Sequence, residues 1–189
     1  MPSAALIHWQ NDRVPRLNEV ERHCATVAAL VPPNPNFLDE TLRGFVLHLS
    51  AHFQGFCRDL YTECTQAWID TIPVGHRATA QAQFSAQLAL QRGNPNYDNI
   101  KRDFNRFGFL LNLPVAHVAG AQQVSDLRCL NEWRNKAAHQ GTKPLGPGVP
   151  PALTHPMVRG WRVSCDGLAG TLDGIMQAEL LRILGVSPW

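Results

Sequence analysis

Apolar residues recur every three or four positions along most of this chain, and patterns that alternate in the manner of a strand are nearly absent. That spacing places apolar side chains on one face of a helix. The clearest case covers residues 37–71. Its apolar stripe holds for about eight helical turns and comprises Leu38, Leu42, Phe45, Leu49, Phe53, Phe56, Leu60, Cys64 and Ala67. The pattern predicts one long helix that forms the spine of an all-α bundle.

Shorter periodic segments predict further helices around this spine. They cover residues 15–31, 76–90, 97–111 and 166–184. The first of these segments runs into the sequence "PPNPN". Proline lacks the N–H that a helix interior needs, so this sequence predicts that the helix stops there.

One more helix is predicted between Ser125, as its N-cap, and Gly141, as its left-handed C-terminal residue. Residues 141–156 then contain five prolines and three glycines, which predicts a long loop before the last helix. The expected fold is therefore an all-α bundle of about five to six helices. It forms a single domain over residues 15–189, preceded by an N-terminal arm of residues 1–14.

Composition narrows the class of protein. The 189 residues are 44% hydrophobic and 17% charged, which is typical of a packed globular protein. The net charge of +2 permits a nucleic-acid partner without requiring one. Five scattered cysteines argue against a disulfide framework or a zinc ribbon and favour small core residues. Neither a signal-peptide pattern nor a stretch of about 18 apolar residues occurs, so we expect a cytoplasmic protein with no membrane partner.

The sequence "NEWRNKAAHQG", residues 131–141, groups the side chains best suited to chemistry. On a helix, Asn135 and His139 lie about 40° apart, and Arg134 lies about 140° from His139. Asn135 can therefore orient the imidazole while the long Arg134 side chain curls toward it. The alternative is a surface arginine together with a histidine that meets the negative end of the helix dipole.

In its context, "LNEWRNKAAHQG" resembles the signature of the HEPN superfamily. In that family an arginine and a histidine, with four to six residues between them, lie at the end of a late helix of an all-α bundle. The helix containing "LHLSAHFQGFCRDLYTEC" is similar to the family's long helix, and the resemblance covers residues 37–184.

The resemblance implies a metal-independent endoribonuclease, of the kind found among toxins and antiviral effectors, that needs no cofactor. Arg134 and His139 would be catalytic and Asn135 would assist. Histidine relays protons near neutral pH, and arginine binds a phosphate as charge develops on it. RNA is then the substrate, a homodimer would supply two copies of each catalytic residue, and a toxin would need a cognate antitoxin protein. The alternative is a helical bundle without catalysis that acts as an interaction or nucleotide-sensing module.

Polar residues flank the apolar stripe of the long helix: His48, His52, Asp59 and Glu63. Many HEPN proteins carry an acidic residue on this helix that approaches the arginine and histidine, and the matching position here holds His52 or Gln54. Two other interpretations stay open for the flank. It could be a solvated helix edge, or His48 and His52 could bind zinc together with Asp59 or Glu63.

The sequence "KRDFNRFG" offers a candidate for phosphate binding. Arg102 and Arg106 lie four residues apart, with Lys101 beside them, and Asp103 dilutes their charge. The alternative is a solvated helix face, because the chain contains no concentrated basic run.

Overall fold

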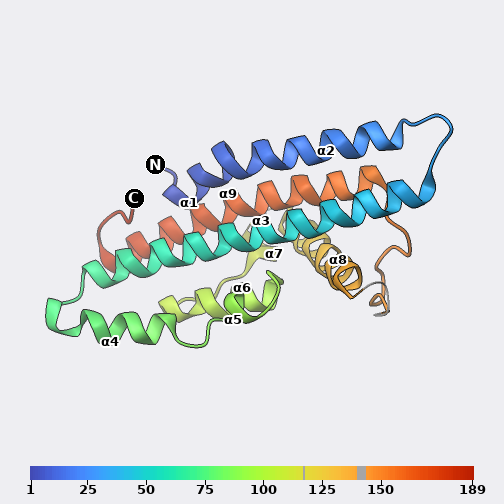
Figure 1. Ribbon diagram of the computed structural model, residues 1–189. Coiled ribbons are helices and arrows are strands. Elements are labelled where there is room, and N and C mark those ends of the chain that lie inside the picture. The colour runs from blue at the N-terminus through green and yellow to red at the C-terminus, as the bar shows by residue number, and fades with distance from the viewer. Residues whose placement is uncertain (117, 140–143) are drawn as a thin grey trace.

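A computed structural model describes residues 1–116, 118–139 and 144–189 of the chain. Within these residues every regular element is a helix, so the all-α prediction is confirmed. Three long helices lie side by side along the molecule: α2 (Val14–Ala28), α3 (Pro35–Asp70) and α9 (His155–Leu184) (Figure 1). The predicted spine is α3, which packs against α2, α8 and α9. None of the helices in the described part of the chain is both long and apolar enough to cross a lipid bilayer.

The apolar stripe of α3 forms the centre of the core. From Leu42 to Cys64 its predicted members are buried, and only Leu38 and Ala67, near the two ends of the helix, are half-buried. All five cysteines are free and buried, as predicted. Burial raises the pKa of each thiol, well above its ordinary value for Cys57 and Cys64. These residues therefore act as small hydrophobic groups.

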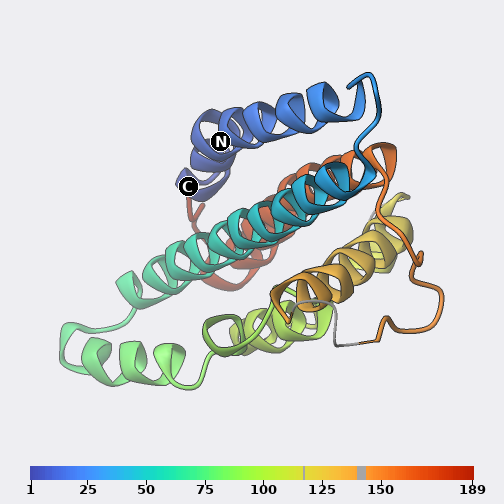
Figure 2. The ribbon, with the colours of Figure 1, turned by 45° about the vertical axis from the view of Figure 1, so that its right-hand side comes forward.

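A second group of helices lies below α3. It comprises α4 (Val74–Ser85), α5 (Ala89–Arg92), α6 (Tyr97–Phe104), α7 (Leu113–Ala116) and α8 (Gly120–Ala138). Figure 2 shows α8 beside α6, with its other side against α3 and α9. A Cβ atom at Gly120 would collide with the Leu113 carbonyl oxygen, so this glycine lets α7 approach the start of α8.

Several boundaries differ from the sequence predictions. The segment predicted over residues 97–111 is α-helical only from Tyr97 to Phe104, and the segment predicted over residues 15–31 ends at Ala28. Helix α8 starts at Gly120, five residues before Ser125, and the predicted C-terminal Gly141 lies outside the described residues. Helix α9 starts at His155 instead of residue 166, because Pro156 lies in its first turn, where a helix tolerates proline. The predicted segment 76–90 divides into α4 and α5. With α1 and α7, the helices outnumber the five to six expected.

The expected N-terminal arm is largely helical. Helix α1 (Ala4–His8) continues through a π-helical turn (Trp9–Arg13) into α2. The Glu63 carboxylate of α3 accepts hydrogen bonds from the backbone N–H groups of Ala4 and Ala5, and Trp9 is buried against Phe53 and Phe56. This segment is too short for its sequence to show a helical period. A helix of this length is not stable alone, and its contacts with α3 stabilise it.

Candidate functional site

The motif residues lie in the last turns of α8. Arg134 and Asn135 are half-buried, and His139 is the exposed residue that directly follows the helix. The backbone N–H of His139 donates to the Asn135 carbonyl oxygen at 3.1 Å, which continues the helical bonding by one residue. His139 therefore stands at the negative end of the α8 dipole.

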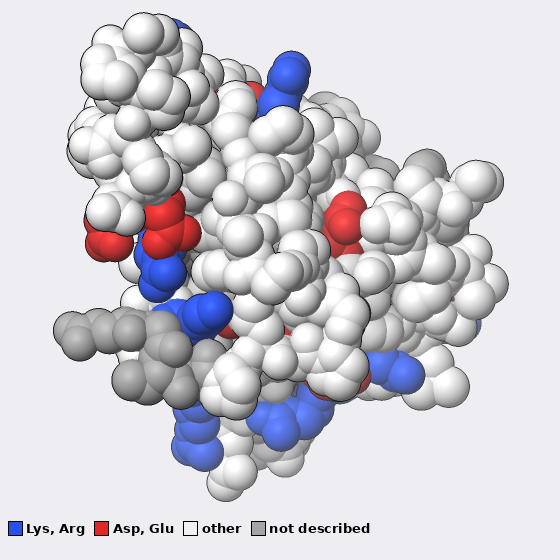
Figure 3. Space-filling view, turned by 90° about the vertical axis from the view of Figure 1, so that its right-hand side faces the viewer, with Lys and Arg blue, Asp and Glu red and all other residues white. Residues whose placement is uncertain are grey.

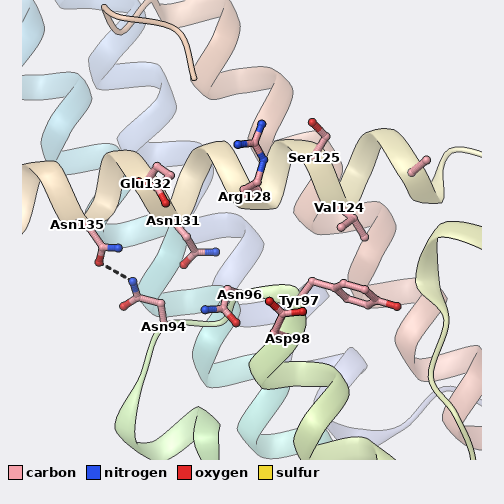
Figure 4. Close-up of a pocket in the computed structure, with 11 residues that line it drawn as sticks. Asn94, Asn96, Tyr97, Asp98, Val124, Ser125, Arg128, Asn131, Glu132 and Asn135 are labelled. Atoms are coloured by element: carbon pink, nitrogen blue, oxygen red, sulfur yellow. Dashed lines mark hydrogen bonds between the residues drawn. The ribbon is translucent and has the colours of Figure 1, made fainter. Parts of the chain in front are cut away.

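Asn135 connects the motif to a different part of the chain. Its side-chain oxygen Oδ1 accepts a 2.6 Å hydrogen bond from Nδ2 of Asn94, in the loop between α5 and α6 (Figure 4). The same oxygen accepts a 3.3 Å bond from Nη1 of Arg134. Asn135 thus fixes the guanidinium of Arg134 while being fixed itself by Asn94.

Gln54, one of the two residues matched to the supporting acidic position, holds this loop. Its Nε2 donates to the carbonyl oxygens of Leu90 and Gly93, both at 2.7 Å. Gly93 directly precedes Asn94 in the same loop. By holding Gly93, Gln54 helps to position Asn94 and, through it, Asn135. An amide suits this position better than a carboxylate, because a carboxylate could not donate to two carbonyl groups.

His52 and Asp59 lie on another face of α3, toward the N-terminal helices. Arg13 donates to the backbone oxygen of His52 at 2.8 Å and forms an ion pair with the Asp59 carboxylate. Burial, followed by the nearby charge of Arg13, lowers the pKa of His52, so this imidazole is neutral near pH 7. The His52 carbonyl group and the Asp59 side chain are therefore part of the contact between α3 and the N-terminal segment.

The zinc interpretation of this flank finds no matching geometry. Glu63 binds the start of α1 and Asp59 binds Arg13. Across residues 1–116, 118–139 and 144–189, no three His, Cys, Asp or Glu side chains are grouped so that they could hold a metal ion.

The three basic residues of "KRDFNRFG" have different surroundings. Lys101 and Arg102 are exposed on α6. Arg106 instead donates to backbone carbonyl groups at the end of α4, the closest being Ala86 at 2.8 Å. Asp103 between them is fully buried and accepts bonds from the N–H groups of Ala89 and Leu90, at the start of α5. Arg106 and Asp103 thus hold α4 and α5 in place.

The buried Trp133 anchors the helix that carries the motif. Its Nε1 donates to the Pro150 carbonyl oxygen at 3.0 Å, and the Lys136 ammonium lies 4.8 Å from its ring centroid. Lys136 and Arg134 thereby add positive charge at the C-terminal end of α8. On the face shown in Figure 3, most of the Lys and Arg surface lies in the lower half of the view, whereas most of the Asp and Glu surface lies in the upper half.

A pocket of about 450 Å³ adjoins the motif, between α8 and the start of α6. Figure 4 shows Asn131 and Asn135 of α8 facing Asn94 and Asn96 across it. The sequence alone did not indicate Asn94, Asn96 and Asn131 as site residues. The run "GNPNYDN", residues 93–99, leads into α6 and was the available signal for Asn94 and Asn96, but asparagine is so common in turns that the run indicates no site by itself.

Comparisons of the chain with protein-family models, with curated proteins and with solved structures found no match.

Proposed function

We propose that the protein is a metal-independent endoribonuclease of HEPN type, acting as a toxin or antiviral defence effector. Arg134 and His139 act on the RNA backbone, and Asn135 positions Arg134. The observation that carries this proposal is the hydrogen-bonded series Asn94–Asn135–Arg134 beside the exposed His139. A half-buried side chain that fixes a guanidinium near the end of the helix that also carries an exposed imidazole is what a preorganised phosphate site requires.

The reaction is an internal transfer at phosphorus. A base removes the proton of the 2′-hydroxyl, the 2′-oxygen attacks the phosphorus, and the bond to the 5′-oxygen breaks as that oxygen takes up a proton. The products are a 2′,3′-cyclic phosphate and a 5′-hydroxyl. Imidazole can supply or accept either proton near neutral pH, and the planar guanidinium of Arg134 can bind two phosphate oxygens as negative charge increases.

The motif of one chain supplies one imidazole, whereas the reaction needs both a base and an acid. We therefore include a homodimer in the proposal, with the ends of two α8 helices meeting across a twofold axis. The exposure of His139 at the end of α8 permits this approach. When His139→Ala chains are mixed in excess with wild type, most wild-type chains should form mixed dimers with an incomplete site. Activity per wild-type chain should then fall, whereas adding an unrelated protein should leave it unchanged. Unchanged activity per wild-type chain in the mixture would contradict the shared site.

The decisive test is cleavage of a labelled RNA by the purified protein in EDTA. Wild type should cut and leave 2′,3′-cyclic phosphate ends, since no step requires a metal-activated water. His139→Ala should abolish cleavage, and Arg134→Lys should reduce it strongly, because lysine keeps the charge but loses the two-point contact.

His23→Ala is the matched control, because His23 is an exposed histidine within α2. It should cut at the wild-type rate. Cleavage by a folded His139→Ala protein would refute the assignment. A wild-type protein without any ribonuclease activity would support the interaction or nucleotide-sensing alternative instead.

A further inference from the structure

The pocket between α8 and α6 has unused hydrogen-bonding groups of opposite kinds. Asn131 is 95% buried, since only 5% of its surface is exposed. Its Nδ2 donates to the carbonyl oxygens of Leu127 and Pro95, at 2.8 and 3.3 Å. Two carbonyl partners fix which end of the amide is the nitrogen. Its Oδ1 is buried and has no hydrogen-bond partner in the described structure.

An unpaired buried acceptor is destabilising, so such groups commonly receive a bond from a bound molecule. Asn131 lines the pocket from its α8 wall. With both N–H groups of its amide already used, Asn131 can only accept from a ligand. The pocket therefore requires a donor at this position.

Asn96 on the opposite wall has the reverse preference. It is the N-cap of α6, and its Oδ1 accepts the backbone N–H of Asn99 at 2.8 Å. Within the described residues no hydrogen bond from its Nδ2 is recorded, so this amide group can donate to a ligand. One wall thus offers an acceptor and the other offers a donor.

The remaining lining selects for a flat base with an amino group. Tyr97 and Val124 provide an apolar surface for a ring, and the Tyr97 hydroxyl is fixed by bonds to Leu111 and Leu113. Asp98 and Glu132 line the same pocket, as does Arg128, whose guanidinium donates to the Pro147 carbonyl oxygen. The carboxylates of Asp98 and Glu132 attract amino groups and repel carbonyl oxygens and phosphates. The volume of about 450 Å³ is large enough for a purine.

We propose that this pocket binds an adenine base of the RNA, with its amino group donating to Asn131 and a ring nitrogen accepting from Asn96. Adenine presents this donor and acceptor side by side, and asparagine amides are its usual partners. Asn135 both lines the pocket and accepts from Arg134, so the phosphate next to the base would lie at the guanidinium. The assignment of RNA as the source of the base rests on the proposed ribonuclease function, whereas binding of the base itself does not.

Isothermal titration of the intact protein with AMP, CMP, GMP and UMP tests the pocket. AMP should bind at least about tenfold more tightly than GMP or UMP, because one well-placed pair of hydrogen bonds discriminates by at least that factor. It should also bind more tightly than CMP, because the single ring of cytosine carries the same donor and acceptor but fills less of the pocket. Asn131→Leu and Asn96→Ser should each weaken AMP binding by about tenfold. Serine keeps the N-cap of α6 but removes the amide donor, so Asn96→Ser remains informative even if Asn131→Leu fails to fold.

Asn34→Ser is the matched control. Asn34 caps α3 by accepting the N–H of Phe37, just as Asn96 caps α6, and it does not line the pocket. It should bind AMP like wild type. Absence of AMP binding, equal binding of all four nucleotides, or wild-type affinity in a folded Asn96→Ser protein would overturn the proposal.

The two proposals fail separately. A protein that binds AMP through Asn131 and Asn96 but cuts no RNA would refute the proposed ribonuclease function and support the assignment of the pocket. A protein that cuts RNA through His139 but binds no AMP would refute the pocket and leave the ribonuclease standing.

Discussion

Replacing Asn94 by alanine isolates the contact on which the proposed site depends. The substitution removes the 2.6 Å hydrogen bond to Asn135 and leaves the backbone of the loop in place. That backbone is held independently, because Gln54 donates to the Gly93 carbonyl and the Asn99 side chain donates to the Asn94 carbonyl. Asn94→Ala should therefore keep the fold and loosen only the position of Asn135 and Arg134.

The size of the effect follows from the bond that is lost. A hydrogen bond between neutral groups contributes about 0.5–1.5 kcal/mol. If this contribution is lost from the transition state, cleavage should slow by about 2- to 13-fold, since 1.36 kcal/mol corresponds to a factor of ten in rate. The loss should be much smaller than that of His139→Ala, because Asn94 is a positioning residue and does not touch the RNA.

Single-turnover RNA cleavage measures this effect, together with Asn135→Ala and the double variant. Because both residues act through one hydrogen bond, the double variant should be little slower than Asn135→Ala alone. Asn36→Ala is the control, since Asn36 is exposed near the start of α3. A folded Asn94→Ala protein that cleaves at the wild-type rate would refute the reasoning, as would losses that multiply in the double variant.

Three further predictions concern stability and the charged residues. Trp9→Ala should lower the free energy of unfolding in urea by about 3–5 kcal/mol, because the buried indole holds the N-terminal segment on α3; an unchanged value would contradict that anchoring. Burial raises the pKa of Asp173. Between about pH 4 and the folded pKa, this carboxyl group therefore keeps its proton in the folded protein and loses it in the unfolded chain. Its contribution to the free energy of unfolding falls as pH rises through that range. Asp173→Asn should flatten that part of the curve of unfolding free energy against pH, and an unchanged slope would refute the assignment. Arg106→Met should speed amide hydrogen exchange in α4 without weakening RNA binding; weaker RNA binding would instead support a phosphate contact.

Local sequence determined the longer helices and the motif. The stripe from Leu42 to Cys64 alone predicted the buried face of α3, because helical spacing depends only on neighbours along the chain. The same local geometry placed Arg134 and Asn135 together near the end of α8. The start of α9 was missed because prolines in a loop and a proline in a first turn look alike in sequence.

Tertiary structure decided which polar residues meet. Gln54 and Asp59 lie about 140° apart on one helix, and only packing assigns Gln54 to the loop before α6 and Asp59 to Arg13. The bond from Asn94 to Asn135 joins residues 41 positions apart. Helical periodicity specifies which face of a helix is buried, but it carries no information about which helix or loop covers that face. The motif could therefore be found in the sequence, whereas its asparagine partner and the adjoining pocket required the folded chain.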